Sequence, residues 1–65
     1  MKITHKALAL LREIYDHEVG CIKLTDSNKM PAHELADNRL VVILPWEKDL
    51  EACIVTAGVR FLFPD

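Results

Sequence analysis

The sequence predicts a single small α+β domain with a long N-terminal helix, a short second helix and a C-terminal β-hairpin. Two patterns carry this prediction. Apolar residues recur at helical spacing near the N-terminus, and two β-branched apolar runs, 40–44 and 52–56, flank a polar stretch. The chain has 65 residues and no internal repeat, linker or low-complexity tract, so we expect one domain, 1–65.

The N-terminal helix is predicted to run from about His5 to Val19. Thr4 stands where an N-cap residue belongs, and Gly20 suits the left-handed position that ends many helices. The apolar residues between these signals share one side of a helix: Ala7, Leu8, Leu11, Ile14, Tyr15 and Val19. We expect this stripe to pack against the core.

The middle of the chain predicts a short strand and then a short helix. Residues 21–25 alternate weakly between polar and apolar side chains, as a strand does. A polar turn, residues 26–29, precedes Pro31, whose fixed backbone angle suits the first position of a helix. We expect this helix to span Pro31 to Asp37, with Asn38 ending it in a left-handed conformation.

The predicted hairpin strands are residues 40–44 and 52–56. Pro45 is expected to end the first strand, because proline has no backbone N–H to donate. The polar stretch 46–51 has the length of an open loop, which we expect in place of a tight two-residue turn.

Residues 57–63 fit two interpretations. Thr56 could cap a short helix, whereas Val59, Phe61 and Phe63 alternate as in a strand. Gly58 marks a break in either case. The choice between helix and strand stays open at this point.

Composition favours a soluble globular protein. The chain is 51% hydrophobic and 28% charged, which excludes disorder, and its longest apolar run, residues 40–44, is too short to span a bilayer. Charged residues interrupt the first helix, so the N-terminus does not read as a secretion signal. We expect a cytoplasmic protein that does not associate with membranes.

Cys21 and Cys53 are the two cysteines of the chain. Without a secretory signal, two isolated thiols are more often buried and reduced than joined, so we predict free thiols. The spacing of histidines and cysteines matches no paired-ligand zinc pattern, and paired carboxylates, a glycine-rich phosphate loop and a nucleophile elbow are absent. We therefore expect no metal, no cofactor and no enzymatic activity.

Two segments within residues 33–63 carry a family resemblance. Ile54 to Leu62 contains a threonine, an alanine–glycine pair, an arginine and then apolar residues. It looks like the end of the wing and the start of the last helix in MarR-like and PadR-like regulators, and His33 to Val41 is similar to the end of their recognition helix. The resemblance implies a winged-helix transcriptional regulator that binds DNA, with residues 46–51 as the wing. Those regulators carry three helices before the wing, whereas this chain has room for about two.

The residues expected to contact DNA are polar or basic and flank or lie on the second helix and the wing: Lys29, His33, Asn38, Arg39 and Lys48. Glu34 and Asp37 on the same helix would be repelled by phosphates. The net charge of −2 and the sequence pI near 5.8 give no general attraction to nucleic acid. DNA binding would therefore need a local basic patch.

The alternative is an acidic protein-interaction module, an adaptor or inhibitor on the same scaffold, or a homodimer. Trp46 in the hairpin loop suits a binding anchor, because tryptophan is enriched among residues that dominate interface energies. Its indole could equally fold back over the core. Phe61, Leu62 and Phe63 pose the same choice between core and interface. An apolar patch around Trp46 would favour a protein partner.

Overall fold

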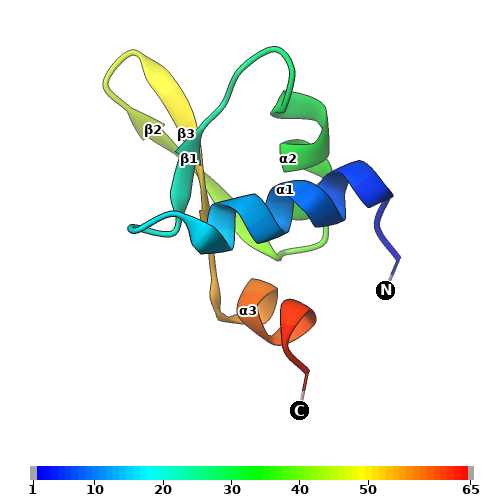
Figure 1. The fold of residues 1–65 in the computed structure, drawn as a ribbon. Coiled ribbons are helices and arrows are strands. Elements are labelled where there is room, and N and C mark those ends of the chain that lie inside the picture. Colours follow the sequence, from blue (N-terminus) through cyan, green and yellow to red (C-terminus); the bar gives the residue numbers. More distant parts are fainter. Residues whose placement is uncertain (1, 65) are drawn as a thin grey trace.

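Three helices and one three-stranded antiparallel sheet make up the structure (Figure 1). The computed structural model describes residues 2–64. The elements in chain order are α1 His5–Asp16, β1 Cys21–Lys23, α2 Lys29–Asp37, β2 Val41–Trp46, β3 Asp49–Ile54 and α3 Thr56–Leu62. The predicted small α+β class is confirmed. Among the described residues, none of the helices combines the length and the apolar character needed to cross a membrane.

Helix α1 begins where the sequence predicts and ends earlier, at Asp16. Thr4 is the N-cap, as predicted, and its side-chain oxygen accepts a hydrogen bond from the Ala7 backbone N–H at 3.2 Å. His17 leaves the helix in an extended conformation (φ −71°, ψ 144°). Val19 therefore lies outside the helix and is 78% exposed, which corrects its predicted place in the core.

The core lies between the helices and one face of the sheet. Its buried side chains are Ala7, Leu10, Leu11, Ile14, Ile22, Ala32, Leu35, Leu40, Val41 and Ala52. Leu10 belongs to the buried side of α1, because it lies three positions after Ala7 and four before Ile14. Tyr15 lies at the edge of that side and is 42% exposed, so its predicted burial is wrong.

The strand order β1-β3-β2 makes β3 central and leaves β1 and β2 as edge strands. Strands Val41–Trp46 and Asp49–Ile54 pair over their full lengths, which leaves only Glu47 and Lys48 in the turn. The predicted open loop over residues 46–51 is therefore wrong. Glu47 adopts a left-handed backbone (φ 55°), the kind of conformation with which two-residue hairpin turns follow the twist of their strands.

Pro45 lies inside β2 and does not end it, which corrects the prediction. The Val55 N–H donates to the Leu40 carbonyl at 3.3 Å, and hydrogen-bonded pairs alternate along an antiparallel ladder. The positions of β2 that bond to β3 are therefore the even-numbered ones. At Pro45 the missing N–H would have pointed to the open edge, so the proline costs the sheet no hydrogen bond.

Helix α2 begins at Lys29, before Pro31. Proline is accepted in the first helical turn because the N–H groups there have no partner inside the helix. At the other end the left-handed residue is Arg39 (φ 61°) and not Asn38, as the sequence predicted. Asn38 ends the helix through its side chain, whose amide Nδ2 donates to the Glu34 backbone carbonyl at 2.9 Å.

Residues 56–62 form helix α3, which settles the open choice in favour of a helix. Its N-cap is Val55, one residue before the predicted Thr56. Gly58 is buried within the helix and is no break. A Cβ atom at Gly58 would collide with the Leu40 carbonyl oxygen and come within 2.7 Å of Ile54 Cγ1, so glycine is what lets α3 approach the sheet this closely.

Glu34 links α2 to the N-terminus of α1. One of its carboxylate oxygens accepts a hydrogen bond from the Thr4 backbone N–H at 2.7 Å, and the other accepts from the Thr4 hydroxyl at 2.9 Å. A carboxylate at the start of a helix also interacts favourably with the helix dipole. Glu34 therefore fixes the angle at which two helices meet.

We expect Glu34→Ala to lower the free energy of unfolding by about 1–2 kcal/mol, since it removes two hydrogen bonds and a helix cap. Urea denaturation measures this loss. The control is Asp37→Ala, which removes an exposed carboxylate from the same helix and should change stability by less than about 0.5 kcal/mol. Equal effects of the two substitutions would contradict the role assigned to Glu34.

Candidate functional site

The face of the sheet that points away from the core is the largest surface on which candidate residues gather. Because side chains alternate along strands, the strand register places them in three rows across this face. The first row holds Cys21, Cys53 and Val42, the second Lys23, Glu51 and Leu44, and the third Asp49 and Trp46. We call these eight residues the outer face.

An apolar stripe runs along β2 on the outer face. Val42, Leu44 and Trp46 are 41%, 44% and 51% exposed, and they occupy alternate positions of an edge strand. The sequence left open whether the Trp46 indole folds back over the core, and its exposure answers that question in the negative. Exposed apolar side chains that adjoin one another in this way mark surfaces that bind other molecules.

Charged residues occupy the centre of the outer face. Lys23 Nζ lies 3.0 Å from Asp49 Oδ2, and both side chains are about half exposed. Lys23 is also the register partner of Glu51. An exposed ion pair of this kind contributes little to stability, so its effect here is to hold the charges beside the apolar stripe.

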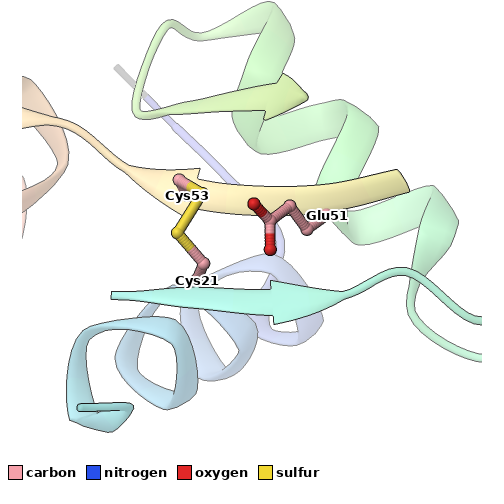
Figure 2. Close-up of side chains that lie close together, drawn as sticks. All are labelled: Cys21, Glu51 and Cys53. Carbon is pink, nitrogen blue, oxygen red and sulfur yellow. A yellow bond between two sulfur atoms is a disulfide. The ribbon is translucent and has the colours of Figure 1, made fainter. Parts of the chain in front are cut away.

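Cys21 and Cys53 form a disulfide between β1 and β3, with the Glu51 carboxylate beside it (Figure 2). The prediction of two free thiols is therefore wrong. The Ile54 N–H donates to the Gly20 carbonyl at 2.8 Å, so the neighbouring pair Cys21↔Cys53 is not hydrogen-bonded. Side chains approach closest at such pairs, and the Cα atoms here are 4.0 Å apart.

Three of the residues predicted to contact DNA line one hollow between α2 and the hairpin. Lys29, His33 and Lys48 lie there together, in a depression of about 300 Å³. Asp26 and Asp49 line it as well, and Asp26 lies 3.5 Å from the Lys29 ammonium. The hollow therefore carries as many carboxylates as lysines.

The other two predicted DNA contacts lie at the far end of α2. The Asn38 side chain is occupied by its hydrogen bond to Glu34, whereas Arg39 is exposed. A helix of nine residues is roughly 14 Å long, which separates Arg39 from Lys29. The structure therefore does not bring all five residues into one patch.

The aromatic candidates also divide into two groups. Phe61 is half-buried and packs against the core, and Phe63 is 56% exposed with its ring centroid 5.0 Å from that of Tyr15. Figure 1 shows α3 at the opposite end of the sheet from the β2–β3 turn. Trp46 therefore shares its surface with Val42 and Leu44, which the sequence analysis did not single out, and not with the C-terminal aromatic residues.

The comparisons with known proteins find no match for this chain among family models, curated proteins or solved structures.

Proposed function

We propose that this chain is a non-catalytic protein-interaction domain that binds through β2, and that its partner there is a second copy of the same chain. The single observation that carries the proposal is the exposed stripe Val42, Leu44 and Trp46 on an edge strand. We also propose a winged-helix-like arrangement, which the element order and the strand order β1-β3-β2 support. The proposal keeps the cytoplasmic location that the sequence predicts.

The backbone of β2 offers hydrogen-bonding groups to a further strand. Since the even-numbered positions of β2 bond to β3, the N–H groups of Val41 and Ile43 and the carbonyl groups of Val41, Ile43 and Pro45 point to the open edge. An edge strand with free groups of this kind pairs readily with another strand. Pro45 removes one donor and so restricts the registers in which pairing is favourable.

Antiparallel pairing of two β2 strands around Ile43 satisfies these groups best. In this register Ile43 bonds to its own symmetry mate, and the Val41 N–H of each copy meets the Pro45 carbonyl of the other. Two-fold symmetry makes every contact occur twice, as in most homodimers. Val42 of each copy then lies across from Leu44 of the other, which joins the two apolar stripes into one surface.

Charge supports the same register. Counting outward from Ile43, Arg39 of one copy lies across from Glu47 of the other, so the dimer gains two pairs of opposite charge. Both residues are exposed and stand just outside the ends of β2. A chain of 65 residues buries only about 60% of its unfolded surface, so pairing also adds core to a marginal domain.

Sedimentation velocity over a range of concentrations tests the proposal. We expect a reversible dimer in the wild type, and Leu44→Lys should raise its dissociation constant by about tenfold or more, because it places a charge in the joined stripe. The matched control is Val19→Lys, which changes an apolar residue that is 78% exposed outside the outer face and should leave the dimer intact. A wild type that is monomeric throughout, or equal behaviour of the two variants, would contradict the proposal.

A charge exchange tests the register itself. Glu47→Arg alone should weaken the dimer, since it brings two arginines together, and Arg39→Glu combined with Glu47→Arg should restore it. Exposed ion pairs contribute about 0.2–1 kcal/mol each, so two pairs change the dissociation constant by a measurable factor of up to about 30. Failure of the double variant to recover affinity would exclude this register.

DNA binding by a small winged-helix regulator is the second candidate function, and one observation favours it. Lys29, His33 and Lys48 come from α2 and the hairpin turn, the elements that correspond to the recognition helix and the wing, and they line one hollow. Amide NMR shifts during titration with mixed-sequence duplex DNA at low salt test this function. Shifts confined to these two elements and reversed by salt would support it, and their absence would exclude it.

Arg39→Gly separates a DNA contact at this position from a structural effect. Glycine adopts the left-handed backbone of residue 39 without strain, so we expect the variant to be as stable as the wild type or more stable by about 0.5–1 kcal/mol. If Arg39 contacts phosphate, the variant remains folded and binds DNA more weakly, with a smaller salt dependence. Unchanged DNA affinity would remove Arg39 from the interface.

A further inference from the structure

Three side chains with metal-binding atoms converge on the outer face (Figure 2). The Cys21 and Cys53 sulfur atoms and a Glu51 carboxylate oxygen lie within 4.8 Å of one another, and all three residues are half-buried. Cys21 comes from β1 and stands directly across from Cys53 on β3. Glu51 precedes Cys53 by two positions, so its side chain lies on the same face of the same strand.

The spacing of these atoms fits a tetrahedral metal ion. Zinc binds thiolate sulfur at about 2.3 Å and carboxylate oxygen at about 2.0–2.2 Å, so ligand atoms around one ion lie roughly 3.6–3.8 Å apart. The three atoms already lie within 4.8 Å of one another. The two sulfur atoms would have to separate from their covalent bond, and rotation of the side chains at this close strand pair provides that movement.

We propose that reduction of the Cys21–Cys53 disulfide opens a Zn²⁺ site formed by the two thiolates and Glu51, with water as the fourth ligand. A dithiol reductant supplies two electrons and two protons, the S–S bond breaks to two thiols, and the reductant becomes a disulfide. Zn²⁺ then displaces the two thiol protons. This inference does not depend on the proposed dimer.

The surroundings of the cluster suit a bound cation. Two thiolates and one carboxylate carry three negative charges, so Zn²⁺ leaves one, and Lys23 stands across from Glu51 to offset it. Half-burial of the three residues leaves room for a water ligand. A reducing compartment such as the cytoplasm, which we propose for this chain, keeps thiols free and so favours the metal-binding form.

Binding of Co²⁺ to the reduced protein, followed by optical absorption, tests the proposal. We expect thiolate-to-cobalt charge-transfer bands at one ion per chain, displacement of the ion by Zn²⁺, and no bands with the oxidised protein. Cys53→Ser should abolish the bands. Glu51→Gln should weaken binding at least about tenfold, on the scale of groups that support metal ligands, and the control Asp49→Asn, on the same face but outside the cluster, should not.

Other outcomes overturn the site. Reduced protein without charge-transfer bands excludes it, and unchanged affinity in Glu51→Gln excludes the carboxylate ligand. One ion per two chains would indicate four thiolates from two molecules and would exclude the single-chain site. If reduction unfolds the chain, Zn²⁺ should restore the amide NMR spectrum of the folded protein, and failure to do so contradicts the proposal.

Discussion

Reducing the disulfide in metal-free buffer is expected to lower the free energy of unfolding by about 3–4 kcal/mol. The bond joins residues 32 positions apart, so it closes a loop that spans α2 and most of the hairpin and restricts the unfolded chain. Chain entropy for a loop of that length gives this magnitude. A domain of 65 residues has roughly 3–10 kcal/mol of stability in total, so the reduced form should be close to unfolding.

Guanidinium denaturation of the oxidised and reduced chain measures this difference. The variant that replaces both Cys21 and Cys53 by serine should behave as the reduced wild type does, because it lacks the same covalent bond without exposing thiols. Superimposable unfolding curves for the oxidised and reduced proteins would show that the bond does not restrain the chain.

Gly58→Ala is expected to cost about 3 kcal/mol or more, at the upper end for overpacked sites. In an ordinary helix the same substitution stabilises by about 1 kcal/mol, since alanine is the better helix former. Here the added methyl group meets the Leu40 carbonyl oxygen, which is backbone and already accepts the Val55 N–H. Relief would require α3 to move away from the sheet.

Ala57→Gly is the matched control, one residue away on the exposed side of α3. It should cost only about 0.5–1 kcal/mol through backbone entropy. Thermal unfolding followed by circular dichroism compares the two variants. A Gly58→Ala protein as stable as the wild type would show that α3 does not pack against Leu40.

Local chemistry made much of the fold predictable. Thr4 caps α1 as expected, because a hydroxyl at an N-cap satisfies a backbone N–H whatever the rest of the chain does. Apolar periodicity located the helix and both hairpin strands. It misjudged Tyr15 and Val19, since burial at the edge of a stripe depends on where the helix ends and on what covers it.

The candidate sites depended on pairing between distant segments. Nothing near Cys21 indicates that it faces Cys53, because that follows from the register of β1 on β3. The apolar alternation at Val42, Leu44 and Trp46 is visible in the sequence once the strand is known to continue through Pro45. Proline argues against a strand interior, and only the odd-numbered, edge-facing position of Pro45 makes it acceptable.

Amide hydrogen exchange at two concentrations tests the central claim, pairing through β2, most directly. If two chains pair around Ile43, the Val41 and Ile43 amides become hydrogen-bonded between copies, so their exchange should slow as the protein concentration rises. The Val42 amide, which the register directs to β3, serves as the internal reference. Exchange at Val41 and Ile43 that is independent of concentration would contradict the account.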